Sequence, residues 1–273
     1  MDADFYSTEL EPIWCPGCGD FAVLYAIKKI FSKLEIEPEE VLIASGIGCS
    51  SRLPGFVKCY GIHSVHGRVL PIAQGAKLAN PDLLVLAVGG DGDGLNIGGG
   101  HFPHAARRNL DITYIMMDNL LYGMTKAQPS ATTELGRVSK ASPFGVIEEP
   151  LNPIVLALSY NVSFVARGFS GDPRGLTELI SDAIEHKGFS FLDVLSPCTT
   201  FFNTYKVIER KAYPIKDHDV TDKVKAFQLS LDKKGIPIGI FYKVRRPTYG
   251  ERLESSGAFE RKMSLEELFS RFG

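Results

Sequence analysis

The sequence predicts an α/β fold in which a parallel sheet carries helices on both faces. Residues 83–88 form a short, uninterrupted apolar run and residues 112–117 a largely apolar one, which are typical of strands buried on both sides of a parallel sheet. Stretches with apolar residues at helical spacing alternate with such runs, beginning with residues 21–34. This alternation indicates βαβ units, whose strands lie parallel.

The individual elements can be placed in chain order. Strands are expected at residues 41–45, 83–88, 112–117, 164–169 and 191–195, with a further short strand before Ser64. Asp20 stands where it can cap the first helix, 21–34. A second helix is expected at residues 97–108. Pro153 and Pro173 open two later helices, because proline suits the first helical position.

The pattern changes after about residue 199. We divide the chain into a main domain, residues 1–199, and a C-terminal extension, residues 200–273. In the extension, residues 220–234 predict a surface helix, residues 236–243 a strand and residues 264–269 a terminal helical turn. We expect this extension to lie over the main domain or to contact a partner chain.

Composition and charge narrow the possible classes of function. The chain has 273 residues, of which 44% are hydrophobic and 23% are charged, and its formal net charge at pH 7 is -2. No long basic tract favours nucleic-acid binding, and no apolar run approaches the roughly 20 residues that span a bilayer. The sequence starts Met-Asp-Ala-Asp, without the basic and apolar regions of a signal peptide. We therefore expect a soluble cytoplasmic protein.

The strongest local motif is Gly-Gly-Asp-Gly-Asp-Gly, which follows the apolar run at residues 83–88. Glycines let backbone N–H groups approach a phosphate closely, and Asp91 and Asp93 beside a diphosphate favour a bridging Mg²⁺. Alone, the motif is equally typical of a tight connection between a strand and a helix. However, Asn119 ends the next strand 28 positions after Asp91. One crossover then brings both residues to the carboxyl edge of the sheet, where ligands bind.

Four of the five cysteines lie where they can bind one metal ion or one cluster together. Cys15 and Cys18 form a Cys-x-x-Cys loop that suits a metal, a cluster or a redox dithiol pair. Cys49 and Cys198 each follow an expected strand and so reach the same carboxyl edge. By chemistry alone, four thiolates fit a [4Fe–4S] cluster and a structural zinc equally well. The odd number of cysteines and the lack of an export signal disfavour disulfides.

Five motifs together resemble the β subunit of 2-oxoacid:ferredoxin oxidoreductases. They are Trp-Cys-Pro-Gly-Cys-Gly from residue 14, Gly-Ile-Gly-Cys-Ser-Ser-Arg from 46, His-x-x-His-Gly-Arg from 63, Gly-Asp-Gly-Asp from 90 and Tyr-Gly-Met-Thr-Lys from 122. The similarity runs from about residue 13 to 198 and resumes at residues 239–243 and 246–249. It implies a thiamine-diphosphate-binding fold for the main domain, which would also carry the ligands of an iron–sulfur cluster.

The resemblance also implies roles for single residues. Asp91, Asn119 and the backbone carbonyl of Leu121 would bind Mg²⁺. The [4Fe–4S] ligands would be Cys15, Cys18, Cys49 and Cys198. Thiamine diphosphate would contact Ile47, Gly48, Cys49, Ser50, His66, Gly67, Asp91, Gly92, Asp93, Asn119, Leu121, Tyr122, Gly123 and Thr125. The fifth cysteine, Cys59, matches no cluster position, and we expect it to be a small buried residue.

The implied activity is the oxidative decarboxylation of a 2-oxoacid with coenzyme A as co-substrate. Electrons would pass through the cluster to ferredoxin. Thiamine diphosphate is activated by a glutamate, and in the family the α subunit supplies this residue. We therefore expect the chain to be inactive alone and to work with an α subunit, as in an (αβ)₂ assembly.

Arg52 and His66 are the candidate catalytic residues. Arg52 follows Cys49 by three positions. A guanidinium binds a carboxylate through two hydrogen bonds. Arg52 therefore favours the dicarboxylic acid 2-oxoglutarate over pyruvate as the substrate, and the product would be succinyl-CoA. A surface ion pair is the alternative for Arg52, and a structural role is the alternative for His66. The alternative functions are a pyruvate-type oxidoreductase, a non-oxidative thiamine enzyme with a four-cysteine zinc site, and a non-catalytic electron-transfer subunit.

Overall fold

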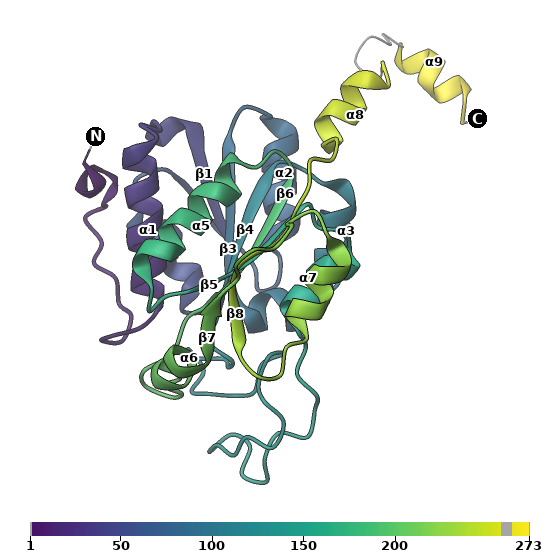
Figure 1. Cartoon of the computed structure of the whole chain (residues 1–273). Helices are drawn as coiled ribbons and strands as arrows, with labels where there is room; N and C mark the ends of the chain where they lie inside the picture. The colour runs from purple at the N-terminus through teal and green to yellow at the C-terminus, as the bar shows by residue number, and fades with distance from the viewer. Residues whose placement is uncertain (1, 258–263, 273) are drawn as a thin grey trace.

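The computed structural model describes residues 2–257 and 264–272, which contain one eight-stranded sheet (Figure 1). The strands lie in the order β2-β1-β3-β4-β6-β5-β8-β7. Their bounds are β1 (Val41–Ser45), β2 (Tyr60–His63), β3 (Leu84–Gly90), β4 (Ile112–Asp118), β5 (Phe164–Phe169), β6 (Phe189–Leu195), β7 (Ala212–Pro214) and β8 (Ile236–Lys243). All five main strands expected from the sequence are confirmed, and β2 is the short strand before Ser64.

The strands β1 to β6 are parallel to one another, as their apolar runs predicted. β1 pairs with β2 on one side and with β3 on the other, so the strand order reverses at this point. Ligands of open parallel sheets bind outside the carboxyl ends of the strands at such a switch point. The topology therefore places a functional site in the loops that follow β1, β3 and β4.

Helices cover both faces of the sheet, as predicted (Figure 1). α1 and α5 pack over side chains such as Ile43 and Leu86, whereas α2, α3 and α4 cover Leu42 and Val85 on the other face. Successive strand residues thus enter different cores, as the pleat requires. The helices are α1 (Asp20–Lys33), α2 (Val69–Ala79), α3 (Phe102–Arg108), α4 (Pro153–Ser159), α5 (Pro173–Glu185), α6 (Tyr205–Lys211), α7 (Lys223–Ser230), α8 (Tyr249–Ser255) and α9 (Leu265–Ser270).

The helix expected at residues 97–108 is wrong in its first half. Gly92–Ile97 forms a π-helical turn, η4, and α3 begins only at Phe102. Three consecutive glycines separate the two, and glycine weakens a helix because it loses the most backbone freedom on folding. A Cβ at Gly99 would lie 2.5 Å from the carbonyl oxygen of Leu95, so this connection is too close for a side chain.

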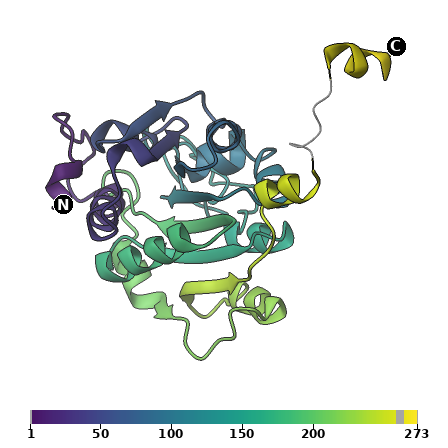
Figure 2. The ribbon, with the colours of Figure 1, turned by 90° about the horizontal axis from the view of Figure 1, so that it is seen from above.

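The C-terminal extension is partly built into the main sheet. β8 runs antiparallel to β5, and β7 runs parallel to β8. The strand expected at residues 236–243 and the terminal helical turn, α9, are both confirmed. The helix expected at residues 220–234 is shorter, because the Asp219 carboxylate accepts from the Thr221 N–H in a turn and Asp222 caps α7. Figure 2 shows α9 standing clear of the body.

None of the helices in the described ranges is long and apolar enough to cross a membrane.

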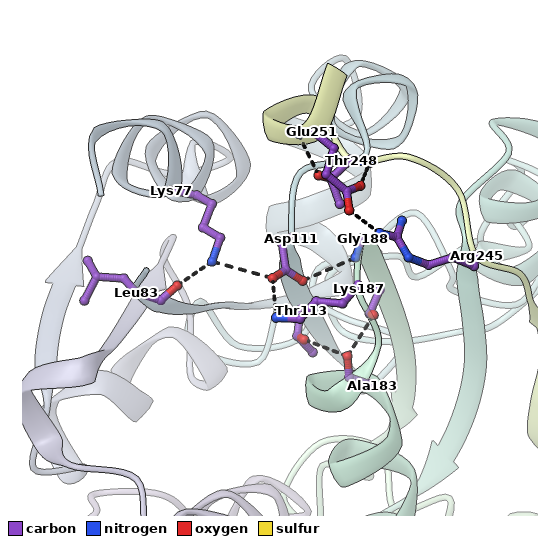
Figure 3. A network of polar contacts seen from close by, with 11 residues as sticks. Lys77, Leu83, Asp111, Thr113, Ala183, Lys187, Gly188, Arg245, Thr248 and Glu251 are labelled. Atoms are coloured by element: carbon purple, nitrogen blue, oxygen red, sulfur yellow. Dashed lines mark hydrogen bonds and ion pairs between the residues drawn. The ribbon is translucent and has the colours of Figure 1, made fainter. Parts of the chain in front are cut away.

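A polar network joins several elements at the edge opposite the carboxyl ends of the strands (Figure 3). Lys77 of α2 is buried; its Nζ donates to the Leu83 carbonyl at 2.6 Å and lies 3.7 Å from the Asp111 carboxylate. Asp111 also pairs with Lys187 at 3.2 Å and accepts from the N–H of Gly188. These contacts fix α2 and the starts of β4 and β6, which helps to hold the opposite ends of the strands in place.

His186, which follows α5, gives the chain a predictable pH dependence of stability. Its ring is buried, with Nε2 2.9 Å from Ser163 Oγ; burial, and then the charge of Lys243, lowers its pKa to about 4. The folded chain keeps this ring neutral, whereas the unfolded chain binds a proton below the ordinary pKa of 6.5. The stabilisation is therefore present above pH 6.5 and is lost as the pH falls toward 4, by about 3 kcal/mol.

We expect His186→Asn to flatten this pH dependence, because asparagine can still bond to Ser163 but does not titrate. The measurement is the free energy of unfolding from urea titrations between pH 7 and pH 4. His104→Asn is the control, since His104 is exposed. Equal pH dependence in wild type and His186→Asn would contradict the assignment.

Candidate active site

A cavity opens at the carboxyl ends of the parallel strands. It is lined by Ile47, Gly48, Cys49, Ser50, His66, Gly90, Asp91, Gly92, Asp93, Asn119, Leu121, Tyr122, Gly123, Met124 and Thr125. The lining includes every residue expected to contact the cofactor except Gly67, whose N–H donates to Asp93 Oδ1. Gly92 has no room for a side chain, because a Cβ there would lie 2.4 Å from the Tyr122 ring. We name this space the diphosphate cavity.

Asp91 is buried at the end of β3 and is held by hydroxyl groups from a distant loop. Its Oδ2 accepts from Ser130 Oγ and, at 2.7 Å, from Thr132 Oγ1. These two partners escaped the sequence reasoning. The one available signal was the run Ser-Ala-Thr-Thr at residues 130–133, which places three hydroxyls together.

Thr132 also lies 2.8 Å from Oδ1 of Asp118. One hydroxyl carries one proton, so Thr132 can donate to only one of the two carboxylates. Burial, and then the charges of Asp91 and Asp193, raises the pKa of Asp118 well above its usual range. Thr132 Oγ1 therefore bridges the buried carboxyl groups of Asp91 and Asp118, and burial raises the pKa of Asp91 as well.

Asp93 connects three loops at the wall of the diphosphate cavity. Its Oδ1 accepts from the N–H of Ile47 at 2.9 Å and of Gly67 at 2.8 Å, and it lies 2.5 Å from Nδ1 of His66. Asp93 is thus engaged within the chain, and its contact with a diphosphate stays a prediction. Donation from Nδ1 to Asp93 would fix the tautomer of a neutral His66 and leave Nε2 as an acceptor.

The loop after β4 has a strained backbone. Leu120 has φ 64°, a left-handed conformation that costs a leucine about 1–2 kcal/mol. Asp118 Oδ1 accepts from its N–H at 3.0 Å, and its carbonyl accepts from Thr133 Oγ1 at 2.7 Å and Arg137 Nη1 at 3.2 Å. Asn119 Oδ1 accepts from the N–H of Leu121, so a local turn orients this side chain.

A second cavity, of about 200 Å³, adjoins the first, and we name it the cysteine cavity. Its lining residues are Ile13, Trp14, Cys15, Cys18, Cys49, Arg52, Asn119, Gly123, Met124, Cys198, Thr199 and Phe201. The structure therefore brings together the four cysteines that the sequence singled out. Cys49, Asn119, Gly123 and Met124 border both cavities.

Hydrogen bonds between the loops hold the cysteine cavity in shape. Trp14 Nε1 donates to the Cys49 carbonyl at 2.7 Å, and Thr199 Oγ1 donates to the Pro16 carbonyl at 2.9 Å. Ser196 Oγ donates to Asp20 Oδ1 at 2.6 Å. Hydrogen bonds that do not involve the thiols thus connect the chain segments that carry Cys15, Cys18, Cys49 and Cys198.

The expectation that Asp20 caps α1 is wrong. Gly19 occupies the N-cap position, and Asp20 is the first helical residue, with a buried side chain turned toward Ser196. Burial raises the pKa of Asp20 to about 6, although the bonds from Ser196 and Cys18 act in the opposite direction. The sequence signal for a cap was sound, but tertiary contacts moved the start of the helix by one residue.

Burial disfavours the thiolate forms of the cavity cysteines. Burial first, and then the charges of Asp20 and neighbouring thiols, raises the pKa of Cys49 to about 11, and burial raises the pKa of Cys18 further. Thiolate ligands need a compensating positive charge, which a metal or cluster provides. Within residues 2–257 and 264–272, no three His, Cys, Asp or Glu side chains form a site for one metal ion.

Sequence comparison assigns the chain to a family. Residues 46–194 match the profile described as "Thiamine pyrophosphate enzyme, C-terminal TPP binding domain". The chain is 42% identical over 261 residues to the 2-oxoacid:ferredoxin oxidoreductase subunit beta of a Sulfolobus species, and the match covers 89% of this chain and 86% of that protein. The chain belongs to the 2-oxoacid:ferredoxin oxidoreductase β subunits.

Further relatives of this β subunit are named for 2-oxoglutarate. The chain is 37% identical to the 2-oxoglutarate synthase subunit KorB of Methanocaldococcus jannaschii, over 89% of this chain and 92% of that one. Residues 198–257 match the profile of the C-terminal part of the pyruvate ferredoxin oxidoreductase beta subunit. A solved chain of the 2-oxoglutarate:ferredoxin oxidoreductase from Magnetococcus marinus, with 2-oxoglutarate, coenzyme A and succinyl-CoA bound, superposes with a TM-score of 0.94. It is 38% identical, and the match covers 100% of this chain and 96% of that chain.

The two candidate catalytic residues of the β subunit lie in different cavities. His66 borders the diphosphate cavity, where it contacts Asp93. Arg52 is exposed, lines the cysteine cavity and has no ion-pair partner among the described residues. The surface ion pair considered for Arg52 is therefore not observed in this part of the chain.

Proposed function

We propose that this β subunit and an α subunit together convert 2-oxoglutarate and coenzyme A to succinyl-CoA and CO₂. Electrons would pass through a [4Fe–4S] cluster to ferredoxin. The observation that carries this proposal is the pair of adjoining cavities, one bordered by Asp91 and Asn119 and the other by four cysteines. Since Cys49 borders both, a cofactor in one cavity would lie next to a one-electron acceptor in the other.

The donors around Asp91 fit Mg²⁺ and a diphosphate. Asp91, Asn119 and the Leu121 carbonyl offer hard oxygen ligands, which Mg²⁺ prefers and shares with phosphate oxygens. Gly92 keeps the backbone free of side-chain bulk beside the Tyr122 ring. When bound, thiamine diphosphate supplies the electron sink for the charge that decarboxylation leaves behind.

His66 is suited to accepting a proton at Nε2 beside this cofactor. Asp93 orients the ring through Nδ1, and the ring borders the diphosphate cavity. A neutral imidazole fixed in this way presents Nε2 as an acceptor at a constant position. Asp93 would therefore act through His66 and through the loops that it ties together.

The cysteine cavity fits a cluster better than a single ion. Cys15, Cys18, Cys49 and Cys198 surround a space of about 200 Å³. A zinc ion draws its sulfur ligands to about 2.3 Å from one point, whereas a [4Fe–4S] cluster fills a volume between them. All five cysteines are free of disulfides, which suits the reducing cytoplasm where we expect the enzyme to work.

An α subunit would complete the site. Among the residues that the structure describes, no glutamate lines either cavity. Thiamine diphosphate needs a glutamate at its aminopyrimidine ring to form the reactive carbanion. We infer that the α subunit supplies it, within an (αβ)₂ assembly.

Arg52 supports 2-oxoglutarate as the substrate. Arg52 lines the cysteine cavity, which shares Met124 with the diphosphate cavity. A guanidinium can bind the second carboxylate of a dicarboxylic acid through two hydrogen bonds, and pyruvate lacks that group. The Magnetococcus marinus relative, solved with 2-oxoglutarate bound, is consistent with this choice.

We expect Arg52→Ala to lower kcat/KM for 2-oxoglutarate by about 10–100-fold, because a charged hydrogen-bonded contact is worth about 1.5–3 kcal/mol. The same change should leave kcat/KM for pyruvate nearly unaltered. The measurement is ferredoxin reduction by the αβ complex with each 2-oxoacid, and Arg52→Lys should give an intermediate value. An unchanged ratio of the two substrates in Arg52→Ala would remove Arg52 as the selector.

Iron and acid-labile sulfide in the complex, purified without oxygen, test the proposed function itself. A brown complex that contains both and reduces ferredoxin with a 2-oxoacid would support it. A colourless zinc complex that decarboxylates without reducing ferredoxin would favour the non-oxidative alternative. A pyruvate preference would favour the pyruvate-type enzyme.

A further inference from the structure

Arg137 lies in the long loop between β4 and α4 and reaches loops of both cavities. Its Nη1 donates to the Leu120 carbonyl at 3.2 Å, and its Nη2 lies 3.5 Å from the Phe201 carbonyl. The guanidinium also stacks on the Phe202 ring, at 3.6 Å from the ring centroid. One side chain thus contacts two segments that lie far apart in the sequence.

The first of these segments carries the proposed magnesium ligands. Leu120 stands between Asn119 and Leu121 and has the strained φ of 64°. Such a conformation persists only where surrounding contacts impose it. The Leu120 carbonyl has two described side-chain donors, Thr133 and Arg137, and Arg137 is the charged one.

The second segment carries a proposed cluster ligand. Cys198, Phe201 and Phe202 form one tight turn, in which the Phe202 N–H donates to the Cys198 carbonyl at 2.9 Å. Arg137 holds the far side of this turn by its contacts with Phe201 and Phe202. These contacts place the positive charge of Arg137 against the turn that carries Cys198.

We propose that Arg137 is a positioning residue. It would hold the loop of residues 119–121 against the turn of residues 198–202, and it would raise the reduction potential of the cluster. The inference rests on the proposed function. A partly buried positive charge stabilises the more negative, reduced form of a cluster, so removing it lowers the potential. The forked, planar guanidinium can bind one carbonyl, approach a second and stack on a ring, which a lysine cannot do.

Two variants separate geometry from charge. Arg137→Gln keeps a short hydrogen-bonding group and removes the charge, whereas Arg137→Lys keeps the charge and loses the fork and the stacking. Arg174→Gln is the matched control, because Arg174 is an exposed arginine on α5 that pairs only with Glu178 among the described residues. All variants are studied as complete αβ complexes purified without oxygen.

Two measurements report on the two halves of the proposed role. Redox titration followed by electron paramagnetic resonance gives the cluster potential, and calorimetry in Mg²⁺ gives the dissociation constant of thiamine diphosphate. We expect Arg137→Gln to lower the potential and to weaken thiamine diphosphate binding by about ten-fold. Arg137→Lys should weaken thiamine diphosphate binding similarly, but its cluster potential should stay closer to that of the wild type. Arg174→Gln should change neither quantity.

Wild-type potential and wild-type affinity in both Arg137 variants would overturn the inference and leave the proposed function intact. A wild-type complex without iron would instead remove the proposed function. If Arg137→Gln fails to assemble a cluster, Arg137→Lys and the affinity for thiamine diphosphate decide between the outcomes. Binding at wild-type strength in Arg137→Lys would then count against the positioning role.

Discussion

Asp91→Asn is expected to weaken the Mg²⁺-dependent binding of thiamine diphosphate by at least about 100-fold. Loss of a residue that hydrogen-bonds to a metal ligand lowers metal affinity by about 10–100-fold. Loss of a charged ligand itself should therefore lower the affinity by at least the larger of these factors. Asparagine keeps the size of the side chain, and its loss of charge is therefore the dominant change. Calorimetric titration with thiamine diphosphate at fixed Mg²⁺ measures the effect.

Thr132→Val should give a smaller loss, about ten-fold, because it removes the hydroxyl between Asp91 and Asp118 and leaves the ligand in place. Asp82→Asn is the matched control, since Asp82 is exposed and remote from both cavities. Thiamine diphosphate bound by Asp91→Asn as tightly as by wild type would show that Asp91 is not a ligand. That result would also favour a subunit that only transfers electrons.

Cys198→Ser is expected to abolish the cluster and, with it, ferredoxin reduction. Serine is a poor ligand for iron in a cluster, and three cysteines leave one corner without a thiolate. The affinity for thiamine diphosphate should change much less, because Cys198 borders only the cysteine cavity. Iron content, visible absorption and calorimetry on the same preparation measure the two effects.

Cys59→Ser provides the control within the same chain. Cys59 packs against the core, burial raises its pKa to about 12, and it borders neither cavity. This variant should keep its iron and its activity, with at most a small loss of stability. Full iron in Cys198→Ser, or iron loss in Cys59→Ser, would show that the four ligands have been assigned wrongly.

The sequence could predict the sheet and most of the two cavities because both follow from regular spacing. Apolar runs marked the strands, and each motif at the end of a run was carried to one edge by the topology. The direction of β8 was not predictable, because a half-buried strand can join a sheet either way. Its neighbour β5 accepts it antiparallel, with a register shift between Val165 and Ala166.

The residues that sequence reasoning missed lie in segments without periodicity. Ser130, Thr132 and Arg137 belong to the loop between β4 and α4, where no repeat of two or 3.6 residues indicates which side chain points inward. Their roles arise from contacts with Asp91 and Leu120, which only the folded chain brings near. Asp20 was misplaced for a related reason, since its partner Ser196 lies 176 positions away.

The wall common to the two cavities has a consequence for how such an enzyme can change over evolutionary time. Cys49, Asn119, Gly123 and Met124 each face both spaces. A substitution that adapts one space to a new substrate would therefore also alter the surroundings of the proposed cluster. Under the proposed function, selection on turnover and selection on the reduction potential would act on the same few residues, so the two properties are expected to change together in laboratory evolution.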